Sequence, residues 1–418
     1  MKTALWLYLF MFLAFFDLHA QYPVLTPFAV SLGAGPAFIG WMMGMYSLTH
    51  LPGNLLAGSL IDRKGSRRYI IGSLIAAGLL LLLQSYAAVP WHLLLTRAFS
   101  GFALAFLSPA CMALLASLSA DKAKQGKYMS GNGIVHTLAS VLSPAAGAYI
   151  VAKAGFGGTF IGIGWLLIAT GVMAYFSLPK PVIKPSPQPQ AVSAGSEGAG
   201  GESAKDQAPG GHGQAPKPAQ WTLSSVWKVE IGFPKRYFLL PFFTACAQGV
   251  LFFELPLSQI GRADGGLIST GALMSLISLG ALLTLSLLFL NRLSPGARIS
   301  AALLMMALCF FGLAAVPALP IAVFLFVLGM SKGILFPATA SLFIGLSDRK
   351  RLGRTFSLQS IATSLGSFAG PVLAGQLREY CSPYFIAFLL LMTALLLLPQ
   401  LYVGHTPTYR PEGNGNAA

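Results

Sequence analysis

The chain has 418 residues, of which 55% are hydrophobic and only 9% are charged, and its mean hydropathy is +0.70. Soluble globular domains carry about 25% charged residues, so this composition excludes a soluble enzyme or a secreted domain. The net charge of +15 would favour nucleic-acid binding in a soluble protein, but here we interpret it as a membrane-orientation signal and expect no nucleic-acid partner. The four cysteines show no C-x-x-C spacing, so neither a metal site nor a disulfide framework is predicted.

Apolar stretches of about 20 residues predict helices that cross the bilayer. In chain order the predicted spans are 4–27, 36–60, 69–88, 91–118, 129–153, 157–178, 237–259, 267–290, 297–316, 319–346, 355–377 and 382–403. Six spans precede a long polar gap and six follow it. The sequence therefore predicts an all-α membrane protein of twelve transmembrane helices in two pseudo-symmetric six-helix bundles. The predicted domains are an N-terminal bundle (1–178), a flexible cytoplasmic linker (179–236), a C-terminal bundle (237–403) and a cytoplasmic tail (404–418).

Two segments leave alternatives open. The linker is rich in Pro, Gly, Ser, Ala and Gln and cannot bury a core, but its end at 221–231 mixes Trp with charged residues and fits either an interfacial helix or a solvated tether. The first span also resembles a cleavable signal peptide, with an apolar run at 4–16 followed by Leu18-His19-Ala20. Cleavage would break the six-plus-six pattern, so we favour an uncleaved first span.

The distribution of Lys and Arg predicts the orientation of the chain. With the N-terminus inside, 22 of the 27 basic residues lie on the cytoplasmic side, whereas only Lys153, Arg262 and Arg378 lie outside. Short cytoplasmic loops carry such an excess. Both termini and the central linker are therefore predicted to be cytoplasmic, in a multi-pass plasma-membrane protein.

An internal repeat relates the two sets of spans at an offset of 227 to 228 residues. In the fourth and tenth spans, Gly101 and Pro109 match Gly329 and Pro337. The loops that follow, 121–127 and 348–354, also match. In the fifth and eleventh spans, Ser143-Pro144-x-x-Gly147-Ala148 matches Gly370-Pro371-x-x-Ala374-Gly375. Two six-helix halves related by duplication suggest a transporter whose substrate site lies between them near the midplane.

The segment between the second and third spans has the most specific pattern of the chain. It reads Gly58-Ser-Leu-Ile-Asp62-Arg63-Lys-Gly65-Ser-Arg67-Arg68. We expect Gly58 to allow a close helix approach, Asp62 to accept hydrogen bonds across an interface and Gly65 to permit the turn. The counterpart at 291–298 is degenerate and lacks the acidic residue.

This segment resembles the signature loop of the major facilitator superfamily, G-x-L-x-D-R-x-G-x-R-R, at every defined position. Other residues resemble motifs of the drug:proton antiporter branch. Arg97 and Gly101 resemble its membrane-embedded arginine motif. Pro144 and Gly147 in the fifth span, and Gly366-x-x-x-Gly370-Pro371-x-x-Ala374-Gly375 in the eleventh, resemble its antiporter motif. The resemblance covers nearly the whole chain outside the linker. It implies a twelve-helix transporter that exports small molecules in exchange for protons, with the signature loop in a conformational gate, and we expect it to be a monomer.

Among Asp, Glu, Lys and Arg, four residues lie deep within predicted spans, where each costs about 2.5 to 3.5 kcal/mol on insertion scales and is a functional candidate by default. They are Asp17, Arg97, Glu254 and Lys332. The resemblance implies that their four spans line a central cavity. From helix rise, Asp17 and Arg97 lie at similar heights, so the two could pair. Glu254 lies nearer the outer edge and Lys332 nearer the middle, so a second pair would need long side chains or water.

The sequence allows two roles for each of these groups. Asp17 and Arg97 form either a static ion pair or a proton-coupling site, and Arg97 and Lys332 either pair structurally or contact an anionic substrate. Glu254 either lines the substrate cavity or faces an outer vestibule. His50 and His136 are either proton relays or packing residues.

We therefore predict a proton-coupled efflux transporter for a small amphipathic molecule, with protons and the lipid bilayer as its other partners and no cofactor or metal. Uptake or facilitated diffusion of a sugar or organic acid, and lipid flipping, are the alternatives. A membrane-embedded enzyme is not predicted, because no D-D-x-x-D or H-x-x-x-x-D run occurs.

Overall fold

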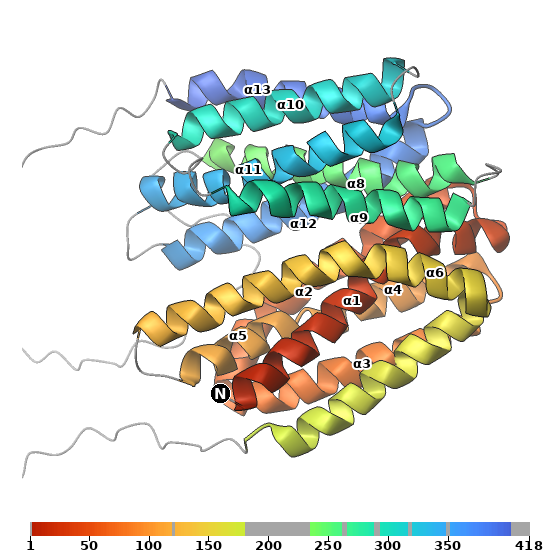
Figure 1. The fold of residues 1–418 in the computed structure, drawn as a ribbon, viewed down its shortest axis with the longest axis vertical. Coiled ribbons are helices and arrows are strands. Elements are labelled where there is room, and N and C mark those ends of the chain that lie inside the picture. The colour runs from red at the N-terminus through yellow and green to blue at the C-terminus, as the bar shows by residue number, and fades with distance from the viewer. Residues whose placement is uncertain are drawn as a thin grey trace, which may run out of the picture. The chain divides into compact units, whose positions relative to one another are not determined.

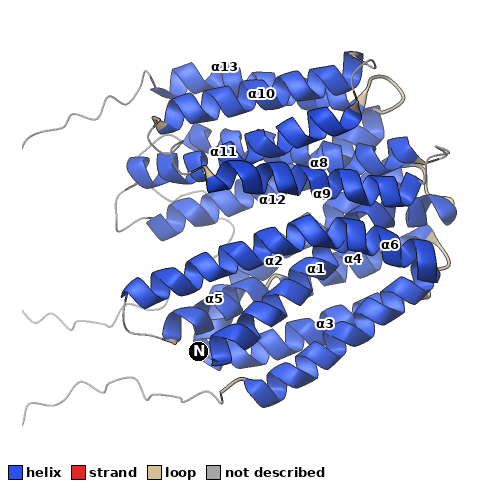
Figure 2. Cartoon of the chain, viewed as in Figure 1, coloured by secondary structure: helices blue, strands red, loops and turns tan. Residues whose placement is uncertain are grey.

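In the computed structural model, the described residues are 2–118, 122–179, 235–260, 266–287, 293–316, 320–347 and 352–402. Every regular element in these ranges is helical (Figure 2). Most of the predicted linker, including its end at 221–231, and the predicted tail lie outside the described residues.

Twelve α-helices and one short 3-10 helix make up the described chain (Figure 1). They are α1 (Lys2–Ser31), α2 (Pro36–Lys64), α3 (Ser66–Ser85), α4 (Pro90–Leu104), α5 (Leu107–Ser117), α6 (Lys122–Ser177), η1 (Lys235–Phe238), α8 (Leu239–Gln259), α9 (Gly266–Ser286), α10 (Pro295–Ala315), α11 (Ile321–Leu346), α12 (Leu352–Leu377) and α13 (Pro383–Tyr402). Each predicted span except 91–118 corresponds to one of these helices or to part of one. The helix ends differ from the predictions by a few residues, mostly because polar residues extend the helices beyond their apolar stretches.

Two predicted spans have a local backbone change. The span 91–118 is divided into α4 and α5 by a turn at Ala105 and Phe106. The spans 129–153 and 157–178 together form α6, which is interrupted at Gly155, where φ is 69° and ψ is 175°. This region of φ favours glycine because a Cβ would clash with the backbone. Gly155 therefore lets the chain reverse direction within what is otherwise continuous helix.

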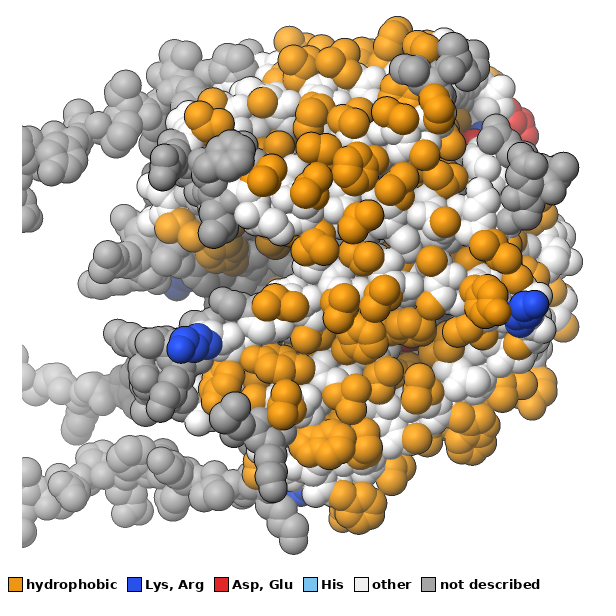
Figure 3. Space-filling model, in the orientation of Figure 1, with side chains coloured by type: hydrophobic (Ala, Val, Ile, Leu, Met, Phe, Trp, Pro, Cys, Tyr) orange, Lys and Arg blue, Asp and Glu red, His pale blue; other side chains and the backbone are white. Residues whose placement is uncertain are grey.

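Eight helical stretches of the described residues are long and apolar enough to cross a membrane. One of them, 131–177, is long enough for two crossings. Apolar side chains cover the face shown in Figure 3, and Lys and Arg side chains appear towards its ends. Such a surface is unsuited to water, so this is an all-α, multi-pass membrane protein.

The first six predicted spans pack in a pattern that the last six repeat. In the first set α2 packs on α4, and α1 and α3 both pack on α6; in the second set α9 packs on α11, and α8 packs on α12. Gly101 of α4 abuts the backbone of Tyr46 on α2, and its repeat partner Gly329 of α11 abuts the backbone of Ile277 on α9. A Cβ at either glycine would clash with that backbone. The repeat found in the sequence thus has the same packing role in both sets.

Contacts between the two sets run along α2 with α12 and along α6 with α9. Their tightest glycine contacts lie towards one end of these helices. There a Cβ on Gly375 would lie 2.6 Å from the Pro36 carbonyl oxygen, and Gly40 abuts the Pro371 carbonyl. On the other side, a Cβ on Gly271 would lie 2.5 Å from the Pro144 carbonyl oxygen. Small residues therefore bring the two sets together at the end formed by the start of α2 and the end of α12.

Candidate functional site

Helix α1 carries polar side chains on two of its faces. Asp17 and Gln21 are one turn apart and share one face, because residues at i and i+4 are neighbours on a helix. His19 and Tyr22 form a second polar and aromatic strip, with ring centroids 5.7 Å apart. Two different polar sites therefore meet the same helix.

The first site is a chain of hydrogen bonds that links α1 to α4. Gln21 Nε2 donates to Asp17 Oδ1 at 2.7 Å, and Arg97 Nη1 donates to Gln21 Oε1 at 3.2 Å. Asp17 and Arg97 are only 2% and 3% exposed. Asp17 and Arg97 are therefore linked through the amide of Gln21, and the structure describes no direct ion pair between them. We name Asp17, Gln21 and Arg97 the polar relay.

An aromatic ring completes the surroundings of Arg97. Its guanidinium carbon lies 4.5 Å from the centroid of the Tyr46 ring on α2, a cation–π contact. Its Nε is buried and has no hydrogen-bond partner within the described residues. His50, one turn beyond Tyr46, stacks on that ring with centroids 5.7 Å apart, and its Nδ1 lies 2.9 Å from Asn54 Nδ2. Arg97 is thus held by an amide and a ring, and the structure describes no ion pair for it.

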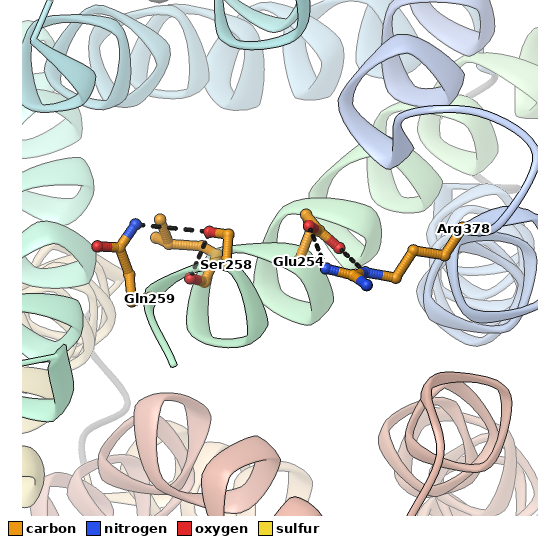
Figure 4. A network of polar contacts seen from close by, with 5 residues as sticks. Glu254, Ser258, Gln259 and Arg378 are labelled. Atoms are coloured by element: carbon orange, nitrogen blue, oxygen red, sulfur yellow. Dashed lines mark hydrogen bonds and ion pairs between the residues drawn. The ribbon is translucent and has the colours of Figure 1, made fainter. Parts of the chain in front are cut away.

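Glu254 of α8 forms an ion pair that the sequence did not predict. Its two carboxylate oxygens accept from Arg378 Nε at 3.0 Å and Nη2 at 3.3 Å (Figure 4). Arg378 lies in the turn after α12, and its side chain is 35% exposed against 8% for Glu254. The suggestion of a second pair between Glu254 and Lys332 is therefore wrong, because Arg378 reaches the carboxylate from the end of the neighbouring helix.

Lys332 instead belongs to a second site, built mainly of rings. Its Nζ lies 6.0 Å from the centroid of the Phe252 ring, which stacks on Tyr22 with centroids 4.5 Å apart. His19 lies 5.7 Å from Tyr22 and 5.4 Å from His136 between ring centroids, the latter edge to face. Phe15 packs edge-on against His136 at 4.6 Å. We name these six residues the basic–aromatic cluster.

The signature loop joins α2 to α3 through Gly65, whose φ of 82° requires glycine and whose N–H donates to the Ile61 carbonyl at 2.8 Å. Arg67 donates to the Tyr175 carbonyl of α6, and its guanidinium carbon lies 5.1 Å from the centroid of the Tyr175 ring. The loop is thus anchored to the end of α6. Asp62, by contrast, is exposed and forms no ion pair within the described residues.

The other charged residues of the loop, Arg63 and Arg68, are also exposed. The expectation that Gly58 allows a close helix approach is wrong for this conformation. A Cβ on Gly58 would meet no described atom within 4 Å, because no neighbouring helix packs against that turn of α2.

The motifs predicted on the fifth and eleventh spans lie at helix crossings. In α6, Pro144 and Gly147 face α9 and α1, since Gly271 meets the Pro144 carbonyl and a Cβ on Gly147 would lie 2.7 Å from Ala20. In α12, Gly366 and Gly370 abut α8 at Phe242 and Cys246, and Pro371 and Gly375 meet α2. Each motif therefore touches one helix of its own set and one helix of the other.

Sequence reasoning missed several members of both sites. Gln21 was detectable, because it lies one turn from Asp17 on the same helix face. Tyr46, Tyr22 and Phe252 carried no signal, because an aromatic residue in an apolar span is ordinarily a packing residue. Arg378 was assigned to an outer loop, and only the fold brings that loop back to α8.

The comparisons with known proteins agree with this architecture. The family model described as Major Facilitator Superfamily matches residues 7–325. The inner membrane transport protein YajR of Escherichia coli is 32% identical over 153 residues, which are 36% of this chain and 32% of YajR. The multidrug resistance protein B homolog of Mycobacterium tuberculosis is 31% identical over 134 residues, which are 32% of this chain and 25% of the relative. The first curated relatives are matched over 40% of their length or less.

Among solved structures, the nucleoside transporter NupG superposes on this chain with a TM-score of 0.70 at 13% sequence identity. The superposition covers 96% of this chain and 99% of the NupG chain. At that identity the likeness concerns the fold alone.

Proposed function

The chain belongs to the Major Facilitator Superfamily and is a transporter rather than an enzyme, and from this we propose that it is a proton-coupled efflux transporter for a small amphipathic molecule. The proposal assigns proton coupling to the polar relay and substrate binding to the residues around Lys332. It includes the antiporter branch and the twelve-span topology of the sequence analysis.

The polar relay is the observation that carries this proposal. Asp17 is a carboxyl group buried within a membrane helix, and such groups mark ion and proton pathways. Its hydrogen-bond partner is the neutral amide of Gln21. Protonation of Asp17 therefore breaks no direct ion pair. An arrangement of this kind allows a proton to bind and leave in each transport cycle.

Alternating access requires two bodies that rock against each other. We propose that these are the predicted bundles 1–178 and 237–403, joined by the linker 179–236 and followed by the tail 404–418. The repeated packing of Gly101 and Gly329 supports this division. The positive-inside excess supports cytoplasmic termini, a cytoplasmic linker and a plasma-membrane location, and we expect a monomer.

Two observations bear on the direction of transport and on the substrate. One relative is named as a multidrug resistance protein homolog, and this supports efflux of an amphipathic molecule. The aromatic rings of the basic–aromatic cluster supply apolar contact area for such a molecule. Uptake and facilitated diffusion of a sugar or organic acid are outcomes that the experiment separates, and lipid flipping is the further alternative.

The test is a substrate screen with purified protein in proteoliposomes under an imposed pH gradient. We expect substrate to move against the proton flux, whereas symport would move it with the flux and facilitated diffusion would ignore the gradient. The variant Asp17→Asn keeps the size of the side chain and removes its titration, so gradient-driven transport should be lost while substrate exchange at equal pH persists. Glu379→Gln, which changes an exposed acid in the turn after α12, is the matched control. Full gradient-driven transport by Asp17→Asn would contradict the assignment.

A further inference from the structure

The basic–aromatic cluster is drawn from four helices of both sets. Phe15, His19 and Tyr22 come from α1 and His136 from α6, whereas Phe252 comes from α8 and Lys332 from α11. The stacked pair Tyr22 and Phe252, with an interplanar angle of 14°, bridges the two sets directly. A ligand held by these side chains would contact both sets at once, which is where repeat-built transporters bind substrate.

None of the six side chains is fully buried, although all lie within helices. Phe15, His19, Tyr22, Phe252 and Lys332 are half-buried, and His136 is exposed. The ring contacts Tyr22–Phe252 and His19–His136 each join two helices. His19 Nε2 is itself shielded and has no hydrogen-bond partner within the described residues. The cluster thus keeps donor capacity that its own side chains do not use.

The charge of Lys332 has no acidic counterpart in the described chain. Glu254, the acid predicted as its possible partner, is held by Arg378 through two hydrogen bonds. Asp17 is held by Gln21, on the other face of α1. An ammonium group near the middle of a membrane helix is costly when uncompensated. The cation–π contact described for it, to the Phe252 ring at 6.0 Å, is at the outer limit of such contacts and therefore weak.

From the unpaired ammonium, the two imidazoles and the surrounding rings, we infer that the basic–aromatic cluster binds the substrate as an organic anion that carries an aromatic ring. This inference rests on the proposed transport function and specifies its substrate class. The Lys332 ammonium pairs with the carboxylate or sulfonate of the ligand, and the imidazoles of His19 and His136 donate further hydrogen bonds to it. The ring of the ligand packs against Tyr22 and Phe252, whose faces suit offset stacking.

The test measures binding at one fixed pH by isothermal titration calorimetry, with purified protein in detergent. The probes are 1-naphthoate, its neutral isostere 1-naphthamide, the cation 1-naphthylmethylammonium, and the ring-saturated decahydro-1-naphthoate. We expect naphthoate to bind more tightly than the other three. Lys332→Gln should weaken naphthoate binding at least about tenfold, the loss expected for a charge-assisted hydrogen bond, and should leave naphthamide binding unchanged. Phe252→Leu should remove the preference for the aromatic acid over the saturated one.

The matched control is Lys153→Gln. The ammonium group of Lys153 also lies 6.0 Å from a ring centroid, that of Tyr149, but this pair lies beside Gly155, outside the cluster. Naphthoate affinity should be unchanged in this variant. Unchanged naphthoate affinity in Lys332→Gln protein with wild-type thermal unfolding, or tighter binding of the cation than of the anion, would overturn the inference.

Failure of the inference differs from failure of the proposed function. Gradient-driven transport of cations or neutral molecules only would overturn the inference and leave proton-coupled transport intact. Naphthoate binding that depends on Lys332, without any gradient-driven transport of naphthoate or of the screened compounds, would overturn the proposed function and support the binding site.

Discussion

At the scale of single residues, Gln21 determines how the buried charges of α1 and α4 interact. Its amide oxygen accepts from Arg97 and its amide nitrogen donates to Asp17, so each charge meets a dipole of the correct sign. A direct ion pair would be a static element, because breaking it would leave two uncompensated charges. With Gln21 between them, the two charges are stabilised separately, and Asp17 can change its protonation state without displacing Arg97.

The first prediction concerns this bridging amide. Gln21→Leu should lower the apparent melting temperature of the purified protein by several degrees, because two buried hydrogen bonds to charged groups are lost, each worth about 1.5 to 3 kcal/mol. Gradient-driven transport should fall as well. Gln84→Leu is the control, since the oxygen of this buried glutamine accepts only a 3.5 Å bond from Thr96. Equal losses of stability in the two variants would show that Gln21 contributes no more than an ordinary buried amide.

The ring beside Arg97 allows a second prediction at the same scale. Tyr46→Phe keeps the aromatic face and should leave stability and transport close to wild type, whereas Tyr46→Leu removes the cation–π contact at 4.5 Å and should lower both. Thermal unfolding and proteoliposome transport measure the difference. Loss of function in Tyr46→Phe would instead assign the role to the hydroxyl group.

At the scale of elements, the pair Glu254 and Arg378 ties α8 to the turn after α12. Glu254 is buried and Arg378 is about one-third exposed, so the partners have unequal access to water. Removing the exposed partner leaves a buried carboxylate uncompensated, which costs more than removing both. The pair therefore contributes chiefly to the position of the turn relative to α8.

A double-mutant cycle follows from this inequality. Arg378→Ala should destabilise the protein by about 1 to 3 kcal/mol, a value reduced from that of fully buried pairs because Arg378 is partly solvated. The double variant Arg378→Ala with Glu254→Gln should be more stable than Arg378→Ala alone. Chemical unfolding in mild detergent measures the free energy of unfolding of the wild type, of each single variant and of the double variant. Additive effects of the two substitutions would mean that no coupling exists.

Glycine contacts between helices make a further prediction for the elements. Gly329→Ala places a Cβ against the Ile277 carbonyl of α9, and backbone cannot yield as a flexible side chain does, so folding yield and thermal stability should fall. Gly72→Ala in α3 is the matched control, because its Cβ would meet no described atom within 4 Å and alanine favours helix. Fluorescence-detected size-exclusion chromatography on heating compares the two. A stable Gly329→Ala protein would mean that α9 and α11 can separate at little cost.

At the scale of the whole molecule, glycine contacts between the two sets lie at the end that the proposed topology places outside. Towards the other end, a Cβ on Gly58 or Gly133 would meet no described atom within 4 Å, and Asp62 is exposed. This pattern fits a state that is closed outside and open to the cytoplasm. In the opposite state, Asp62 would pair across the cytoplasmic interface, since rocking brings the inner helix ends together.

The prediction for this scale is that Asp62→Asn favours the inward-facing state and slows turnover, while insertion remains normal because Arg63 and Arg68 still supply positive charge. Maleimide labelling of Gly133→Cys from the cytoplasmic side reports the shift and should increase. The half-buried Cys381 is first replaced by Ser to lower background labelling, since Cys111, Cys246 and Cys309 are buried.

Gly35→Cys, in the turn before α2, is the control on the other side, and its labelling should not increase. If neither cytoplasmic labelling nor turnover changes in Asp62→Asn, the loop serves only as an orientation signal.

The sequence alone determined the helices, the repeat and the four buried charges, because each depends on local properties. A long apolar stretch must be helical in lipid to satisfy its backbone hydrogen bonds, and a Gly at a crossing or a charge in a span is visible residue by residue. Gly65 was likewise expected to permit the turn after the second span, and it adopts a positive φ.

Only the tertiary structure decided the partners of those charges. Asp17 and Arg97 lie at similar heights, but the side chain of Gln21 reaches both first. Glu254 lies on a span facing the interior, yet Arg378, 124 residues further along the chain, takes its carboxylate and thereby leaves Lys332 among rings. Depth along a helix follows from residue counting, whereas pairing depends on the rotation of each helix about its axis and on where distant turns return. These are set by packing between helices, which a single sequence does not record.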